Sequence, residues 1–241
     1  MRFRALATDY DGTLAHDGVV ADSTNAALKR LAASGRELIL VTGRHLSDLK
    51  AVYSRLNLFD RVVAENGALL YDPKTQKENL LCRRPPKQLL SALERKGVKA
   101  IVGRAIIATW LPYHAAVLEA IRDANVDYQA ILNKDAVMLL PEGIDKAKGL
   151  AAALDDLKID ARSVVAVGDA ENDEVFLAAS GCGVAVANAL PTLKRRADVV
   201  MTRDHGAGVE ELIEHLLRND LDCLARAETW SGNEQRAEDP A

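Results

Sequence analysis

Two aspartates stand two positions apart on a glycine turn, directly after the first apolar run of the chain. They are Asp9 and Asp11 in the segment Asp9–Leu14, and the run before them, Arg4–Thr8, is predicted to be a strand. In open α/β sheets, ligands lie outside the carboxyl ends of the strands. One carboxylate placed there can attack phosphorus while the other exchanges a proton with the leaving oxygen. The pattern therefore indicates phosphoryl transfer; the alternative is a turn in which the aspartates only cap backbone amides.

A calcium-binding loop is a further alternative, and spacing tests it. Such a loop needs a glycine in its middle and a glutamate at its end. Here Gly12 comes one position after Asp11, and Val20 occupies the place of the closing glutamate. The calcium-loop interpretation is therefore excluded.

A second pair of carboxylates follows another apolar run, Val164–Val167, which is predicted to be a buried strand. The segment Gly168–Asp173 places Asp169 and Asp173 four residues apart, with Asn172 between them. Magnesium prefers oxygen ligands and keeps several waters, so a few carboxylates and a substrate phosphate suffice to bind it. Helix capping could explain one such cluster, but capping alone hardly explains two at separate strand ends. We expect a magnesium site here.

Candidate phosphate-binding groups follow the run Leu38–Val41. Thr42, Gly43 and Arg44 stand where a strand gives way to a helix, and a hydroxyl with a glycine amide at that place suits a phosphate oxygen. Thr-Gly is also a common structural turn, which is the alternative. The segment Glu65–Ala68, which closes the next strand, favours a purely structural turn because Asn-Gly is a good turn former.

Lys146 opens a predicted helix after a glycine turn. A lysine there is unfavourable because the helix N-terminus is already positive. That placement is reasonable if the ammonium faces an anion. Lys148 is a competing assignment, and a solvated lysine is the alternative. His45, His114 and His205 lack metal-ligand spacing and are expected to be solvated or capping residues.

Strands and helices alternate in two stretches of the chain, which predicts the two halves of one doubly wound, mainly parallel α/β sheet. The expected strands are Arg4–Thr8, Leu38–Val41, Val62–Ala64, Val164–Val167, Gly183–Val186 and Val199–Met201. The expected helices are one capped by Asp22 or Ser23 and ended by Gly35, then Leu46–Leu56, Lys146–Leu157, Glu171–Ala179, Pro191–Ala197 and Val209–Leu217.

Between these stretches we expect a small inserted α+β domain. Its predicted elements are a helix over Pro85–Lys96, one long strand over Ala100–Trp110, a helix over Pro112–Ala124, and a hairpin of Tyr128–Leu132 and Ala136–Leu140. The predicted domains are thus a core of 1–71 and 141–224, a cap of 72–140, and a polar tail of 225–241 without periodicity, expected to be flexible.

Composition narrows the class of protein further. Hydrophobic residues make up 49% of the chain and the formal net charge is −4, so a packed globular protein is expected, and a nucleic-acid partner is not. No apolar segment approaches the roughly 20 residues that span a bilayer, and the first residues lack the pattern of a signal peptide. The three cysteines are too far apart for a metal knuckle or a disulfide framework. We therefore expect a cytoplasmic protein without a membrane partner.

Four segments together resemble the haloacid dehalogenase superfamily of aspartate-nucleophile phosphotransferases. Asp9–Leu14, Thr42, Lys146 and Gly168–Asp173 match its motifs in order, across nearly the whole chain. The insertion lies between the second and third motifs, as in the Cof-like branch, which includes archaeal phosphoglycolate phosphatases and sucrose-phosphate phosphatases. At 72–140 the insertion is short for this branch, which argues against bulky substrates.

The resemblance implies a role for each matching residue. Asp9 would be the nucleophile and a magnesium ligand; Asp11 would be the general acid and base and would bind the metal through its carbonyl. Thr42, Gly43 and Lys146 would hold the phosphoryl oxygens, with Arg44 beside them. Asp169 would ligate magnesium directly, Asp173 directly or through water, and Asn172 would orient the substrate.

The expected activity is that of a magnesium-dependent phosphatase acting on a small phosphorylated metabolite through an aspartyl-phosphate. A phosphomutase of the same superfamily shares these motifs and is the main alternative. A phosphoacceptor switch domain also uses an aspartate cluster but is about half this length and lacks a cap. A binding module that has lost activity is the remaining alternative. No oligomeric state is predicted.

Overall fold

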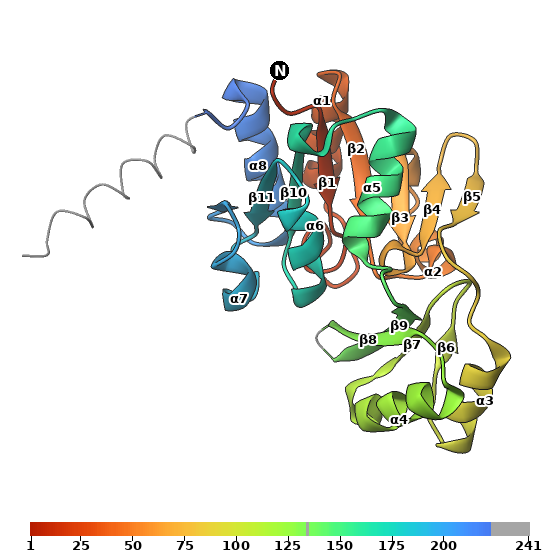
Figure 1. Ribbon diagram of the computed structural model, residues 1–241. Helices are drawn as coiled ribbons and strands as arrows, with labels where there is room; N and C mark the ends of the chain where they lie inside the picture. Colours follow the sequence, from red (N-terminus) through yellow and green to blue (C-terminus); the bar gives the residue numbers. More distant parts are fainter. Residues whose placement is uncertain (134, 223–241) are drawn as a thin grey trace, which may run out of the picture.

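The protein consists of a large α/β unit and a smaller α+β unit joined by two chain crossings (Figure 1). The computed structural model describes residues 1–133 and 135–222. Lys134, Cys223 and the predicted tail of 225–241 lie outside the described residues. Within the described residues no helix is both long enough and apolar enough to span a bilayer.

Eight strands form the large sheet in the order β12-β11-β10-β1-β2-β3-β4-β5. From β12 to β3 all neighbours are parallel; β4 is antiparallel to β3, and β5 is antiparallel to β4. The strands are β1 (Ala5–Thr8), β2 (Glu37–Val41), β3 (Arg61–Ala64), β4 (Leu69–Asp72), β5 (Lys77–Leu80), β10 (Val164–Gly168), β11 (Cys182–Ala185) and β12 (Val199–Val200). The predicted doubly wound, mainly parallel sheet is confirmed.

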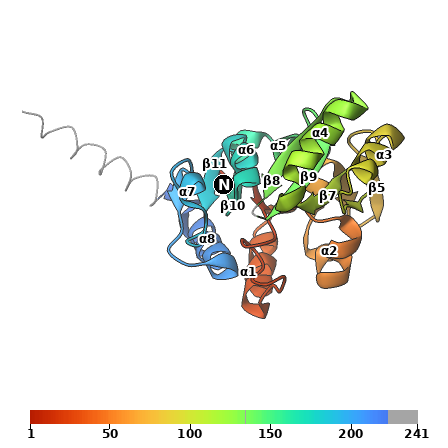
Figure 2. The ribbon, with the colours of Figure 1, turned by 90° about the horizontal axis from the view of Figure 1, so that it is seen from below.

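Helices cover both faces of this sheet (Figures 1 and 2). One face carries α5 and α6, and the other carries α1, α2 and α8. The helices are α1 (Asp22–Ala33), α2 (Leu46–Val52), α5 (Lys146–Leu157), α6 (Glu174–Ala178), α7 (Pro191–Lys194) and α8 (His205–Asn219). Because both faces are covered, the central strands have no solvated side and are apolar except for Thr8 at the end of β1 and Glu37 at the start of β2.

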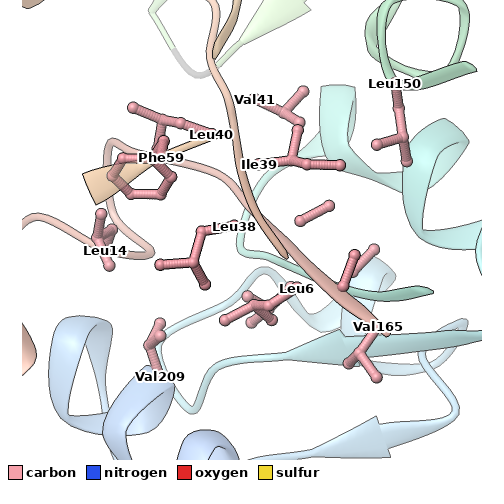
Figure 3. Packing of buried hydrophobic residues seen from close by; sticks show 14 of the residues in the cluster. Leu6, Leu14, Leu38, Ile39, Leu40, Val41, Phe59, Leu150, Val165 and Val209 are labelled. Carbon is pink, nitrogen blue, oxygen red and sulfur yellow. The ribbon is translucent and has the colours of Figure 1, made fainter. Parts of the chain in front are cut away.

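Alternation along β2 shows how the core is divided (Figure 3). Leu38 and Leu40 point to the face where Phe59 lies, while Ile39 and Val41 point to the opposite face, toward Leu150 of α5. Successive side chains of a strand point to opposite faces, so one continuous apolar run serves two hydrophobic layers.

The smaller unit is an antiparallel sheet in the order β6-β7-β9-β8, with two helices on one face. Its elements are α3 (Lys87–Arg95), β6 (Ile101–Val102), β7 (Ile107–Trp110), α4 (His114–Ala124), β8 (Tyr128–Asn133) and β9 (Ala136–Pro141). On β9, Val137 and Leu139 pack against the helices, while Met138 and Leu140 pack on the other face, in a cluster that includes Ala68 of the large unit. We call this unit the cap.

Two predictions about the insertion are wrong. The expected single strand Ala100–Trp110 is two strands, β6 and β7, paired antiparallel through a turn at 103–106. The expected start of the insertion at Asp72 is too early, because β5 (Lys77–Leu80) pairs with β4 and continues the large sheet. Gly103 and Arg104 interrupt the first segment at the turn between β6 and β7, and Asp72 and Pro73 lead into the turn between β4 and β5, not into the cap. Which strands pair across these turns is not visible in the local pattern.

Helix ends also differ from the prediction. Neither Asp22 nor Ser23 caps α1: the N-cap is Ala21, with no side-chain hydrogen bond, and Asp22 is the first helical residue. The helix expected over Leu46–Leu56 ends at Val52 and is followed by a short 3-10 turn, Leu56–Leu58. The hairpin of β8 and β9 and the start of α5 at Lys146 agree with the prediction.

Candidate active site

Three neighbouring parallel strands end at one edge of the large sheet, and each end carries a predicted site residue. Asp9 follows β1, Thr42 follows β2 and Asp169 follows β10. Because β1 lies between β2 and β10 in the sheet, these three residues meet although they are distant in sequence. The cap lies at this same edge (Figure 1).

A buried cluster of carboxylates forms at this edge. Asp9, Asp169 and Asp173 each offer a carboxylate oxygen, and these oxygens lie within 4.8 Å of one another. Lys146, which is 1% exposed, reaches into the cluster from the start of α5. Its Nζ donates to Asp9 Oδ1 at 2.6 Å and to Asp173 Oδ1 at 2.5 Å. Lys148 is exposed, and only Lys146 of the two lysines lies in this cluster.

The charges of this cluster do not balance. Three carboxylates face one ammonium group, and all four groups are buried. Burial and the repulsion of Asp173 raise the pKa of Asp9 well above its usual value, although Lys146 opposes this. Burial alone would lower the pKa of Lys146, but Asp173 and Asp9 raise it. Like charges this close in a partly dry site favour the binding of a cation, and oxygen ligands suit a divalent metal ion.

Asp173 organises the loop around the cluster. Its Oδ2 accepts hydrogen bonds from the backbone amides of Asp169 at 2.8 Å and Ala170 at 2.9 Å. A side chain at Gly168 would meet this carboxylate, since a Cβ there would lie 2.5 Å from Cβ of Asp173. On the other strand end, the Thr13 hydroxyl donates to Asp169 Oδ1 at 3.1 Å. The two aspartate motifs therefore hold each other in place.

Asp11 lies apart from this cluster and is held by Arg44. The Nε of Arg44 donates to Asp11 Oδ2, and a terminal guanidinium nitrogen donates to Oδ1, both at 2.6 Å. Its hydrogen bonds to the Asp11 carboxylate raise the pKa of Arg44. Arg44 was expected among the phosphate-binding residues; in this structure its guanidinium is instead occupied by Asp11, an assignment that the sequence pattern had no means of showing.

A cavity of about 200 Å³ opens over the site. Its core side includes Asp9, Asp11, Thr42, Gly43, Arg44 and Asn172. Its other wall comes from the cap, where Ile101, Ala108 and Met138 line it. The small volume and the apolar cap wall suit a small substrate.

Four polar residues of the cap, Arg104, Gln129, Asn133 and Lys134, could recognise a substrate by their chemistry. Arg104 forms an ion pair with Glu78, and Gln129 donates to the carbonyl of Ile144; neither lines this cavity. The backbone of Asn133 lies in β8, but its side chain and Lys134 are outside the described residues. Ile101, Ala108 and Met138 were not anticipated, because apolar residues of a strand carry no chemical signal in the sequence.

Asn66, Asn188 and His205 form hydrogen bonds around the site, and little in the sequence indicated this. The Asn172 amide donates to Asn66 Oδ1 at 3.0 Å, and both side chains are buried. Asn188 donates to the carbonyl of Gly12 at 2.7 Å, and His205 Nδ1 lies 2.9 Å from the same oxygen. Asn66 belongs to the turn Glu65–Ala68, for which the sequence favoured a purely structural role. Its side chain nevertheless accepts a hydrogen bond from the predicted site residue Asn172.

Known proteins share both this sequence pattern and this fold. The family model described as haloacid dehalogenase-like hydrolase matches residues 6–107 and 116–213. A phosphoglycolate phosphatase of Methanothermobacter thermautotrophicus is 31% identical over 89% of this chain and 99% of its own. Phosphoglycolate phosphatase 2 of Saccharolobus solfataricus is 28% identical over 88% of this chain and 91% of its own.

Solved structures show the same fold. A haloacid dehalogenase-like hydrolase from B. subtilis superposes with a TM-score of 0.75 at 20% identity, covering 89% of this chain and all of that one. A subclass IIB sugar phosphatase superposes with a TM-score of 0.74 at 19% identity, covering 88% and 98%. With the family model matching most of the chain, the protein belongs to the haloacid dehalogenase-like hydrolase family and is one of its phosphatases.

Proposed function

We propose that this protein is a magnesium-dependent phosphatase that hydrolyses a small phosphorylated metabolite through a phosphoryl group carried on Asp9. The observation that carries the proposal is the placement of Asp9. It stands at the end of the central strand β1, lines the cavity, and is held by Lys146. A carboxylate fixed in this way can act as a nucleophile toward phosphorus.

In the first step an Asp9 oxygen attacks phosphorus, and the bond between phosphorus and the leaving oxygen breaks. Asp11 gives its proton to that leaving oxygen. In the second step Asp11 takes a proton from water, whose oxygen attacks phosphorus, and the bond to Asp9 breaks to release phosphate. Because Arg44 holds both oxygens of Asp11, Asp11 has to part from at least one guanidinium nitrogen to act.

Positioning and charge neutralisation supply most of the catalysis in phosphoryl transfer. Thr42 and Gly43 line the cavity, and the hydroxyl of the first and the backbone amide of the second could donate to phosphoryl oxygens. Lys146 holds Asp9 in place through its hydrogen bond to Oδ1 and adds positive charge to the site. Asn172, anchored by Asn66, can orient the substrate.

The unbalanced carboxylates fit a bound magnesium ion. Asp9, Asp169 and the Asp11 carbonyl would hold it, and Asp173 would do so directly or through water. Bound there, magnesium would neutralise charge on the phosphoryl oxygens. Both oxygens of Asp173 already accept hydrogen bonds, so its main role is to hold Lys146 and the loop of Asp169.

The relatives named phosphoglycolate phosphatases and the small cavity point to the same kind of substrate, a short phosphorylated acid or sugar. The test is a panel of phosphorylated metabolites with magnesium, in which released phosphate and the organic product are both measured. We expect phosphate release, with phosphoglycolate among the good substrates. An isomerised phosphate ester without free phosphate would instead identify a mutase.

A further inference from the structure

Glu65 is a buried carboxylate that the proposed reaction does not use. It is 1% exposed, at the turn Glu65–Gly67 that follows β3. Its backbone has a φ of 52°, and that of Asn66 has a φ of 53°, a left-handed conformation that is uncommon for residues other than glycine. Burying a charge is unfavourable unless it is well paired, so this residue calls for a partner.

The partners of Glu65 come from the cap. Its Oε1 accepts a hydrogen bond from the backbone amide of Arg104 at 3.1 Å. Its Oε2 accepts from the amides of Ala105 at 2.8 Å and Ile106 at 3.1 Å. One side chain of the core thus binds three successive amides of the turn between β6 and β7, which we call the cap turn (103–106). Burial alone would raise the pKa of Glu65, but the neighbouring His45 and these amides hold it below its usual value.

Side chains of the core also pack closely against the cap turn. His45 Nδ1 lies 3.8 Å from Glu65 Oε1. A Cβ on Gly103 would lie 2.2 Å from His45 Nδ1 and 2.9 Å from Glu65 Oε2. Glycine is therefore required at this position by the close approach of the cap to the core.

The turn that carries Glu65 is also tied to the phosphate-binding segments. The amide of Glu65 donates to the carbonyl of Arg44 at 2.9 Å, and that of Asn66 donates to the carbonyl of Thr42 at 3.0 Å. A Cβ on Gly67 would lie 1.8 Å from the carbonyl oxygen of Asp145, next to Lys146. The position of the cap turn is thus set directly against the residues that surround the phosphoryl group.

The cap turn joins two of the three cap strands that line the cavity; the third is β9, which carries Met138. Ile101 lies on β6 and Ala108 on β7, one on each side of the turn, and both line the cavity. Any movement of the turn moves this wall relative to Asp9. We propose that Glu65 is a positioning residue, which fixes the cap turn on the core and thereby determines which leaving groups fit over Asp9. This inference rests on the proposed phosphatase function.

The test compares Glu65→Gln with Glu78→Gln. In the first variant an amide nitrogen replaces one acceptor oxygen and faces backbone N–H groups that need an acceptor. Glu78 forms an ion pair with the Arg104 side chain and, among the described residues, accepts no hydrogen bond from the amides of the cap turn, so the second variant removes charge nearby and leaves the three amides bound. Gly103→Ala disturbs the same contact from the cap side. It replaces Glu65→Gln in the test if Glu65→Gln does not fold.

Two measurements are made on each variant of the full chain. NMR hydrogen exchange of the Arg104, Ala105 and Ile106 amides reports the contact itself. We expect exchange at least about tenfold faster in Glu65→Gln and near wild type in Glu78→Gln.

The second measurement concerns activity. Hydrolysis of the best substrate in the panel is compared with the exchange of oxygen between inorganic phosphate and water, for which no organic leaving group has to be recognised. We expect KM of that substrate to rise about tenfold and the oxygen exchange to stay within about twofold.

Three results decide the matter. Amides that remain as protected in Glu65→Gln as in the wild type would overturn the contact. Hydrolysis and oxygen exchange that fall together would overturn the positioning role, since Glu65 would then support the core alone. If the wild type neither hydrolyses a substrate nor exchanges phosphate oxygen, the proposed function and the specificity role both fail, and amide exchange alone decides whether Glu65 holds the cap.

Discussion

Lys146 and Asp9 stand 137 positions apart in the sequence and are joined by a buried hydrogen bond of 2.6 Å. The same ammonium group binds Asp173, so a single cation links the end of β1, the start of α5 and the loop after β10. Neither aspartate is close to Lys146 in sequence, and all three groups are almost completely shielded from water. The cluster therefore depends on tertiary structure, because β1, α5 and the loop after β10 each contribute one of its groups.

Replacing Asp9 by asparagine is expected to abolish turnover and leave the fold intact. The amide has nearly the same shape but lacks a nucleophilic oxygen, so phosphate release should fall at least about a thousandfold. The melting temperature should stay the same or rise, because one of three crowded negative charges is removed. Asp22→Asn, at the exposed start of α1, is the control. Retention of a substantial fraction of the activity would rule out Asp9 as the nucleophile.

Activity is expected to need magnesium and to be inhibited by calcium. Calcium takes more ligands at longer distances, so it would hold Asp9 in a poor position for attack. Phosphate release is measured after chelation and after addition of each ion. Magnesium should also raise the melting temperature of the wild type, since it binds the folded state. Full activity after exhaustive chelation would contradict this prediction.

Lys146→Met is expected to destabilise the protein in the absence of metal. Removing one partner from a buried ion pair leaves uncompensated charge, which typically lowers the free energy of unfolding by about 3 to 5 kcal/mol. Urea unfolding measures this loss, and Lys148→Met on the exposed side of the same helix is the matched control. Adding Asp173→Asn to Lys146→Met should recover part of the loss, since the two residues interact directly. Equal stability of the two lysine variants would show that the buried pair contributes nothing.

Ala108→Leu is expected to narrow substrate choice. Ala108 is part of the cap wall of a cavity of only about 200 Å³, so three added carbon atoms take up space needed by the leaving group. We expect kcat/KM to fall about tenfold more for the larger substrates of the panel than for the smallest. Ala115→Leu, at an exposed position of α4, is the control. An unchanged substrate ranking would show that this wall does not select the leaving group by size.

Asp220 is expected to stabilise the fold in a way that is lost in acid. Burial alone would raise the pKa of Asp220, but the amides of Arg2 and Phe3 and the Arg36 guanidinium lower it. The folded pKa thus lies below the unfolded value of about 3.9, so the stabilisation is present above that value and disappears as pH falls through the folded pKa. The difference in urea midpoint between wild type and Asp220→Asn should shrink between about pH 5 and about pH 3. A difference that is constant over this range would refute the assignment.

Much of the fold and the site could be predicted from the sequence because the information is local. An apolar run such as Val164–Val167 followed by Gly168 and Asp169 marks the end of a buried strand, whatever lies beside it. Parallel strands covered on both faces are necessarily apolar, and their ends are where polar residues can appear. The positions of Asp9, Thr42 and Asp169 at one sheet edge follow from this pattern alone.

Only the tertiary structure decided which groups face each other. Arg44 could serve a phosphate or a carboxylate by its chemistry, and the fold places it on Asp11. Glu65 stood in a turn that favoured a structural interpretation, and the fold gives its carboxylate three amides of the cap. The segment Ala100–Trp110, interrupted by Gly103 and Arg104, forms two strands because β6 and β7 pair with each other through the turn at 103–106. Side-chain partners and strand pairing depend on distances between segments remote in the chain, and residue types and local periodicity do not specify those distances.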